Sequence, residues 1–278
     1  MKRIVSLMLT VIMLLCSCAA FADAATDDSY QKILDKGNLI MGLDDSFPPM
    51  GYRDENGDIV GFDVDVAREV CSRMGVELVL QPISWDAKVI ELNSGNIDCI
   101  WNGFTITDEL QEQLTFSEPY LANTQIIVVR NDSDAQTLSD LAGKSLGVQA
   151  GSSAVAALDA NPDFRDSVTV NEFKDNMTAM LDLENGGLDA VLVDVIVAGY
   201  YFSQHDCDLR QLDESLAAEE YGVGFRKDDL ALVENVNRIL NEMAEDGTLA
   251  EISTKWFDSD ITTVGKTDAD ADDDATAA

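Results

Sequence analysis

The sequence predicts an α/β protein made of two lobes that a pair of extended segments connects. Three observations lead to this prediction. Strand-like and helix-like stretches alternate along the chain, which is typical of a largely parallel α/β sheet. A helix–turn–strand pattern occurs twice, at an offset of 91 residues from Leu92 to Leu183. Two β-rich runs, residues 125–130 and 221–226, would carry the chain into the second lobe and back.

The alternation begins after a polar stretch that ends at residue 29. Residues 30–36 have helical spacing, and Gly37 stands where a helix ends. Residues 39–43 form an apolar run typical of a buried strand, and residues 54–58 carry strong turn chemistry. The elements expected after this turn are a helix over residues 65–74, a strand over 77–81 and a helix over 86–93.

The repeated pattern covers residues 92–102 and residues 183–193. Each copy has a helix that ends at a glycine, then a short turn and a buried strand. Two lobes of one design explain the repeat, while chance recurrence of a common αβ unit is the alternative. Further along, the apolar positions within residues 228–245 recur at helical spacing, and Gly247 ends that helix.

The N-terminal residues 1–22 have the pattern of an export signal. Lys2 and Arg3 precede an apolar run over residues 4–15, which is too short to span a bilayer. Two processing routes stay open: lipidation of Cys18, or cleavage after the small residues at 20–22. Both routes place the protein outside the cytoplasm, either in the periplasm or as a membrane-anchored lipoprotein.

Composition excludes several classes of function. A net charge of −34 repels nucleic acid, and the acidic tail over residues 267–278 is expected to be disordered. Cys71, Cys99 and Cys207 have no metal-ligand spacing, and His205 is the only histidine, so we expect no metal and no cofactor. One disulfide or three small buried thiols both remain open for these cysteines. The sequence also lacks the common hydrolase, metalloprotease and phosphate-loop motifs, so no enzyme is predicted.

The candidate binding residues follow the predicted strands, because ligands bind outside the carboxyl ends of parallel strands. Four places qualify: residues 44–47, residues 101–105, residues 149–153 and Asp194. The turn at 151–153 opens a helix and suits a carboxylate or phosphate. Asp194 ends a buried strand, so its carboxylate needs either a ligand ammonium or a salt bridge within its lobe.

Several short motifs then indicate a family. They include the following, in order along the chain: residues 61–66 (GFDVDV), Gly95 with Ile97 and Asp98, residues 105–107 (TIT), residues 116–120 (FSEPY), Gly151 with Ser152, residues 187–190 (GLDA) and residues 255–257 (KWF). In order and spacing they resemble family 3 of the bacterial extracellular solute-binding proteins, which serve ABC transporters for polar amino acids and opines. The resemblance covers about residues 30–258.

This resemblance implies a Venus-flytrap fold of the periplasmic-binding-protein type II, with a ligand between the lobes. Lobe one would comprise residues 27–121 and 222–264, and lobe two residues 126–217. The chain would be a monomer that binds a small polar solute, an amino acid or a related amine, and delivers it to an ABC permease. A ligand-sensing protein and an enzyme similar to cyclohexadienyl dehydratase are the alternatives.

The resemblance also implies roles for individual residues. Phe47 and Trp85 would face the ligand side chain, and Asp44 would lie near its distal end. Ser153 would bind the α-carboxylate, and Asp194 would accept the α-ammonium. The donors and acceptors from lobe one would be Asn102, Gly103 and Thr105.

One position departs from the family pattern. Where relatives that bind free α-amino acids usually carry an arginine that holds the α-carboxylate, this chain has Leu110. A planar guanidinium cannot be replaced by leucine. Three explanations stay open: another arginine reaches the site, the ligand has no free carboxylate, or Ser153 and its helix end suffice.

Overall fold

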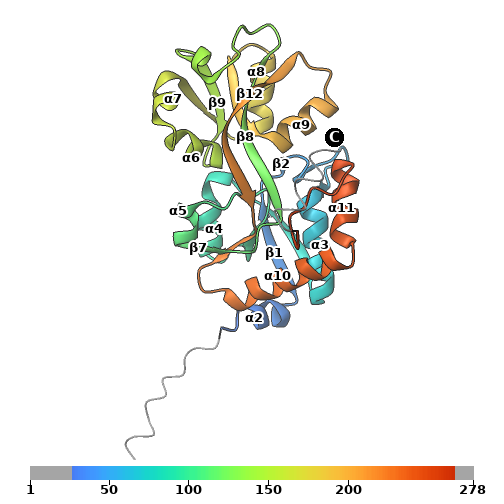
Figure 1. Cartoon of the computed structure of the whole chain (residues 1–278). Coiled ribbons are helices and arrows are strands. Elements are labelled where there is room, and N and C mark those ends of the chain that lie inside the picture. Colours follow the sequence, from blue (N-terminus) through green and yellow to red (C-terminus); the bar gives the residue numbers. More distant parts are fainter. Residues whose placement is uncertain (1–26, 267–278) are drawn as a thin grey trace, which may run out of the picture.

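The computed structural model describes residues 27–266 and contains two five-stranded sheets with helices around each (Figure 1). The predicted signal at residues 1–22, the lipidation site Cys18 and the acidic tail at 267–278 lie outside the described residues. Within residues 27–266, no helix is both long and apolar enough to cross a bilayer.

The first sheet, in the lower half of Figure 1, has the strand order β5-β1-β6-β13-β7. Its strands are β1 (Asn38–Leu43), β5 (Glu77–Pro82), β6 (Cys99–Ile100), β7 (Leu114–Phe116) and β13 (Gly224–Arg226). The helices beside it are α2 (Ser29–Lys36), α3 (Phe62–Met74), η2 (Trp85–Ala87), α4 (Lys88–Asn93), α5 (Asp108–Gln113), α10 (Leu230–Glu245) and α11 (Thr248–Phe257). A small antiparallel sheet of β2 (Ser46–Phe47), β3 (Gly51–Arg53) and β4 (Ile59–Val60) follows β1.

The second sheet, in the upper half of Figure 1, has the strand order β10-β9-β11-β8-β12. Its strands are β8 (Leu121–Arg130), β9 (Ser145–Gln149), β10 (Thr169–Phe173), β11 (Ala190–Asp194) and β12 (Leu209–Tyr221). Its helices are η3 (Leu138–Leu141), α6 (Ser153–Asp159), α7 (Pro162–Ser167), α8 (Asn176–Glu184) and α9 (Val195–Gln204). The predicted fold class is confirmed.

The sequence repeat corresponds to a structural repeat. The first copy runs from α4 into β6 and the second from α8 into β11, and each of these strands is the central strand of its sheet. Gly95 and Gly186 follow the two helices with φ angles of 77° and 78°, a conformation that favours glycine. The repeat therefore reflects the same arrangement in both sheets, and chance recurrence of a common αβ unit is not needed to explain it.

The expectation of largely parallel sheets needs a correction. β1 is parallel to β5 and β6, and β9 is parallel to β10 and β11. The remaining two strands of each sheet are antiparallel to their neighbours. Both sheets are therefore mixed, because one strand of each runs against the others: β13 in the first sheet and β8 in the second.

The connecting segments also differ from the prediction. β8 and β12 form a long antiparallel ribbon that runs between the two halves of the molecule (Figure 1), with Leu121 opposite Tyr221 at one end and Arg130 opposite Leu209 at the other. The predicted run 125–130 lies inside β8. The predicted return run 221–226 is wrong, because residues 224–226 are β13 of the first sheet and the chain returns through β12.

Most predicted elements lie where the pattern placed them, with shifted ends. α3 begins at Phe62 and not at residue 65. The residue before it, Gly61, packs against the backbone of Met50, and a Cβ at this position would lie 2.2 Å from the Met50 carbonyl oxygen.

The three cysteines of the described residues form no disulfide with one another. Cys71 and Cys99 are buried free thiols, and Cys207 is a half-buried free thiol.

Candidate functional site

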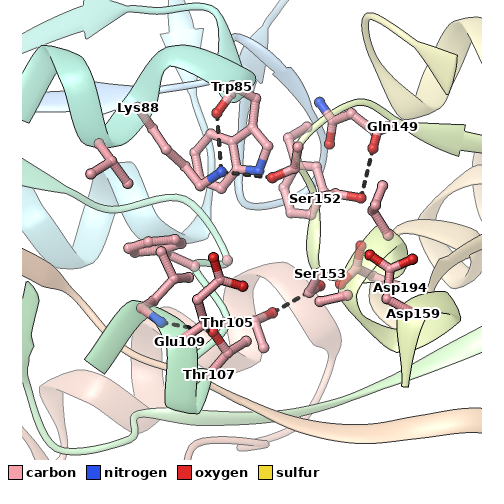
Figure 2. Close-up of a pocket in the computed structure, with 18 of the residues that line it drawn as sticks. Trp85, Lys88, Thr105, Thr107, Glu109, Gln149, Ser152, Ser153, Asp159 and Asp194 are labelled. Atoms are coloured by element: carbon pink, nitrogen blue, oxygen red, sulfur yellow. Dashed lines mark hydrogen bonds between the residues drawn. The ribbon is translucent and has the colours of Figure 1, made fainter. Parts of the chain in front are cut away.

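A cavity of about 310 Å³ lies between the loops at the facing ends of the two sheets (Figure 2). From the first sheet it is lined by Phe47, Trp85, Lys88, Val89, Gly103, Phe104, Thr105, Thr107, Glu109, Leu110 and Gln113. From the second sheet it is lined by Gln149, Gly151, Ser152, Ser153, Val155, Ala156, Asp159 and Asp194. Both sets follow the carboxyl ends of parallel strands, as expected for this fold.

Six of the eight predicted binding residues line this cavity: Phe47, Trp85, Gly103, Thr105, Ser153 and Asp194. The other two, Asp44 and Asn102, are buried behind its wall. The Asp44 carboxylate accepts a hydrogen bond of 2.7 Å from Gln149 Nε2, and its backbone N–H donates to Asn102 Oδ1 at 3.1 Å. Burial raises the pKa of Asp44 to about 6. The Asp44 side chain therefore bonds across the junction between the halves, while Asn102 stays within the first half, and direct contact of either with a ligand stays a prediction.

The wall that belongs to the first sheet is fixed by a buried carboxyl group. Asp63, the third residue of the GFDVDV motif, accepts hydrogen bonds from the Gly103 backbone N–H at 2.6 Å and from the Tyr120 hydroxyl at 3.0 Å. Gly103 itself has a φ of 53°, and a Cβ there would lie 2.7 Å from the ring of Phe47. This geometry explains why the chain needs glycine and a distant aspartate to shape the loop at residues 101–105.

Asp194 lies at the opposite wall, at the end of β11 and immediately before α9. Its Oδ1 accepts hydrogen bonds from Asn123 Nδ2 at 2.6 Å, Gln125 Nε2 at 2.9 Å and the Tyr221 hydroxyl at 2.6 Å. No lysine, arginine or histidine in the described part of the chain forms an ion pair with it. Burial, and then the nearby charge of Glu219, raise its pKa to about 7.

Glu219 on β12 is a second carboxylate behind the same wall. Its Oε2 accepts from Asn123 Nδ2 at 3.0 Å and Gln125 Nε2 at 3.1 Å, the two amides that also serve Asp194. It also lies 3.1 Å from Thr105 Oγ1 and 3.2 Å from Ser153 Oγ. The hydroxyl protons of Thr105 and Ser153 therefore point to Glu219, or from Thr105 to Ser153 at 3.1 Å. Ser153 Oγ also accepts a hydrogen bond from Gln125 Nε2 at 3.2 Å, so of the two hydroxyls it is Thr105 whose oxygen is left to accept a hydrogen bond in the cavity.

Lys88, the first residue of α4, is buried in the wall of the cavity. Its ammonium lies 5.0 Å from the centre of the Trp85 ring and 5.9 Å from that of Phe104, and these two rings meet edge to face. It donates hydrogen bonds to the carbonyl oxygens of Trp85 at 3.1 Å and Gly151 at 2.6 Å. Burial lowers its pKa to about 8. Apart from Lys88, no lysine or arginine of the described residues lines the cavity, and Leu110 does line it.

Contacts across the cavity hold the two halves together in this structure. Lys88 bonds to the carbonyl oxygen of Gly151, and Thr105 bonds to Ser153 (Figure 2). On a different side, the rings of Tyr52 and Tyr200 lie 5.6 Å apart. The cavity is therefore seen with its two walls in contact.

Sequence reasoning missed Lys88, Glu219 and the two amides Asn123 and Gln125. Lys88 sits three residues after Trp85, where a helical pattern gives no indication of a binding role. The amides lie on β8, of which residues 125–130 were predicted and only as a connection, and Glu219 lies on β12, which was not predicted as a strand. One signal could have indicated the two amides: they are polar residues on the otherwise apolar β8, and buried amides on a strand need hydrogen-bond partners.

The fold and the cavity together define a class: two-lobed α/β proteins that hold a small solute between their lobes. Residues 39–259 match the family model described as bacterial extracellular solute-binding proteins, family 3. The chain belongs to this family. The resemblance drawn from the sequence motifs is therefore confirmed.

Individual relatives support the same assignment. The L-cystine-binding protein TcyJ of Escherichia coli (strain K12) is 34% identical over 248 residues, which are 88% of this chain and 91% of the relative. The arginine-binding extracellular protein ArtP of Bacillus subtilis (strain 168) is 31% identical over 89% of this chain and 97% of its own length. The crystal structure of an ABC uptake transporter substrate-binding protein from Streptococcus pneumoniae with bound histidine has a TM-score of 0.83 and 36% identity. That match covers 86% of this chain and 100% of the other.

Proposed function

We propose that this protein is the substrate-binding component of an ABC transporter and that it captures an amino acid, or a closely related amine, outside the cytoplasm. The observation that carries the proposal is the buried Asp194 carboxylate, which lines the cavity and has no cation among the described residues. The three donors to Asp194 Oδ1 are all neutral, and a cation stabilises a buried carboxylate further by compensating its charge. The ammonium of a ligand supplies the cation.

Two further features of the cavity support a ligand of this size and charge. Its volume of about 310 Å³ is at the lower end of the range for small-molecule sites, which fits a single amino acid. Besides Asp194, the carboxylates of Glu109 and Asp159 line the cavity, against one lysine, Lys88. An excess of acidic side chains in the wall favours a ligand that carries a positive charge.

The proposed mechanism is capture without chemistry. Lobe one (residues 27–121 and 222–264) and lobe two (residues 126–217) close around the ligand by bending β8 and β12, and the closed form docks on a permease. The ligand leaves unchanged. The protein acts as a monomer in the periplasm, or on the membrane surface if Cys18 is lipidated.

The test is a thermal-unfolding and calorimetric screen of the mature protein against the common amino acids, their amides and their decarboxylated forms. Micromolar affinity, about −8 kcal/mol, is ordinary for such a role. A ligand at 100 times its Kd adds about 2.7 kcal/mol of stability and raises the Tm by roughly 5–10 °C. If no compound of these three sets shifts the Tm, the proposed function is wrong.

An enzymatic role is the second candidate, because one similar structure is of an ancestral amino acid-binding protein described as a precursor of cyclohexadienyl dehydratase, with 30% identity and a TM-score of 0.77. Asp194, with its raised pKa, and Lys88, with its lowered pKa, are the groups of this cavity that could move a proton near pH 7. We propose that no turnover occurs. Incubating the protein with each bound compound and following the compound by NMR would overturn this if a product accumulates.

A further inference from the structure

The cavity contains a cation that the assigned binding roles do not use. Lys88 is 7% exposed and lines the cavity, and none of the carboxylates among residues 27–266 forms an ion pair with it. Taking an ammonium out of water without an anion is costly. A buried, unpaired charge in the wall of a binding cavity indicates a ligand of opposite charge.

Contacts within the protein hold the Lys88 ammonium in place before any ligand binds. Two of its three N–H groups are directed to the carbonyl oxygens of Trp85 and Gly151, and the aromatic rings of Trp85 and Phe104 lie beside it. One N–H group is left without a partner among the described residues. An ammonium held by one residue from each half of the molecule, with one donor to spare, is well placed to bind an anion when the halves are closed.

Other groups near the cavity are poorly suited to that anion. The Thr105 hydroxyl gives its proton to Glu219 or Ser153, and the Ser153 hydroxyl gives its proton to Glu219, so neither has a proton left for an anion. Leu110, where the family resemblance expected an arginine, lines the cavity without any polar atom on its side chain. Lys88 is therefore the side chain of the wall that carries both a positive charge and a spare donor.

Lys88 and Asp194 project from opposite walls (Figure 2), so the cavity presents a positive charge on one side and a negative charge on the other. A zwitterion carries the complementary pair. We propose that Lys88 binds the carboxylate of the ligand, while Asp194 binds its ammonium, so that the ligand is an α-amino acid and not a decarboxylated amine. This inference rests on the proposed function and narrows it to one ligand class.

The experiment compares each amino acid with its carboxamide, which keeps the α-ammonium and the side chain but removes the negative charge. The probes are L-arginine with L-argininamide and L-histidine with L-histidinamide, measured by calorimetry on the full mature protein. For the wild type we expect the better-bound amino acid to bind at least tenfold more tightly than its amide. A charge-assisted hydrogen bond is worth about 1.5–3 kcal/mol, which corresponds to roughly 10- to 150-fold.

The decisive variant is Lys88→Met, which keeps the length of the side chain and removes the charge. We expect it to weaken binding of the amino acid roughly 10- to 100-fold and binding of the amide by less than threefold. Lys144→Met is the matched control, because Lys144 is also a single positive charge but does not line the cavity; it should change neither affinity. If Lys88→Met does not fold, Lys88→Gln replaces it with the same expectation.

The outcomes separate the inference from the proposed function. Equal loss for amino acid and amide would show that Lys88 only latches the two halves together, and no loss for either would show that it does not contact the ligand. Tighter binding of the amide by the wild type would show that the ligand lacks a carboxylate. Each of these overturns the inference and leaves the proposed function standing. If the wild type binds none of the amino acids, amides or amines in the screen, both are wrong.

Discussion

The Asp194 side chain combines burial with hydrogen bonds from three donors, and it makes no ion pair with a described residue. Because its pKa is about 7 in the ligand-free protein, the carboxyl group is mostly protonated at pH 5 and mostly charged at pH 8. A ligand ammonium stabilises the charged form. Binding should therefore expel a proton at acidic pH. The titratable groups that face it, Glu219 and Tyr221, both come from β12, and β8 adds the neutral amides Asn123 and Gln125.

The first prediction is that ligand affinity rises as the pH increases from 5 to 7, by at most roughly tenfold per unit, levels off between pH 7 and about pH 8, and falls at higher pH as Lys88 loses its charge. The sign follows from the raised pKa, since the neutral acid present at low pH does not attract an ammonium. Calorimetry at pH 6 in two buffers with different heats of ionisation should detect release of close to one proton per ligand. In Asp194→Asn, affinity should fall at least about tenfold and proton release should disappear. Binding without proton release in the wild type would contradict the role of Asp194.

The second prediction concerns Glu219→Gln. The charge of Glu219 helps to raise the pKa of Asp194, so its removal should lower that pKa and move the pH midpoint of ligand binding to a lower value. The glutamine oxygen can still accept hydrogen bonds from Thr105 and Ser153, which keeps the local structure. Glu220→Gln is the control, because Glu220 is the exposed neighbour on the same strand. An unchanged midpoint in Glu219→Gln would mean that the two carboxylates do not interact.

At the scale of elements, the turn that connects β9 to α6 closes against η2 across the cavity. Gly151 in this turn has a φ of 67°, and a Cβ there would lie only 2.8 Å from the Cα atom of Asp86. Contact between two backbones at this distance leaves no room for a side chain. The closeness of the two halves therefore depends on a single glycine.

The third prediction follows from this contact: Gly151→Ala should weaken ligand binding at least about tenfold by preventing full closure. Alanine at this φ also costs roughly 1 kcal/mol of stability wherever it occurs. Gly143→Ala separates the two effects, because Gly143 has a similar φ of 78° but no atom lies within 4 Å of the place that an alanine Cβ would take there. Both variants should lose a similar amount of thermal stability, and only Gly151→Ala should lose affinity. Equal affinities for the two variants would contradict a closure role for Gly151.

At the scale of the whole molecule, the dominant feature is charge. The chain has 52 acidic side chains and 18 lysines and arginines, giving a net charge of −34. The ion pairs in the described part are mostly at the surface, for example Lys32 with Asp28 and Arg238 with Glu242, and such pairs contribute little. Repulsion between the excess carboxylates therefore destabilises the compact state.

The fourth prediction is that the Tm of the ligand-free protein rises by several degrees between about 20 mM and 500 mM NaCl, because salt screens this repulsion. Thermal unfolding followed by circular dichroism measures the change. Sucrose at equal osmolality serves as the uncharged control and tells screening from general exclusion of cosolvent. A Tm that is constant or falls with salt would show that the surface charges are already compensated.

The comparison between sequence and structure shows where local patterns suffice. Apolar β1 and β11, the helix stops at Gly95 and Gly186, and the repeat that joins them are all local patterns, and they predicted the two-sheet fold. β12 was missed as a strand because its sequence, LRQLDESLAAEEY, alternates poorly and lies at an exposed sheet edge. Pairing with β8 over most of its length makes it a strand, and no short-range pattern contains that information.

The sequence by itself determined the fold class, the family and the nature of the ligand-binding edge, because these depend on periodicity, on turn residues and on motifs that are contiguous along the chain. Only the tertiary structure decided which side chains share the cavity. In the folded protein, Lys88 contacts Gly151 across the two halves, Glu219 lies behind Thr105 and Ser153, and Asp44 does not line the cavity. The physical reason is that burial, charge pairing and hydrogen-bond direction depend on distances between residues far apart in sequence, and the packing of the two sheets sets those distances.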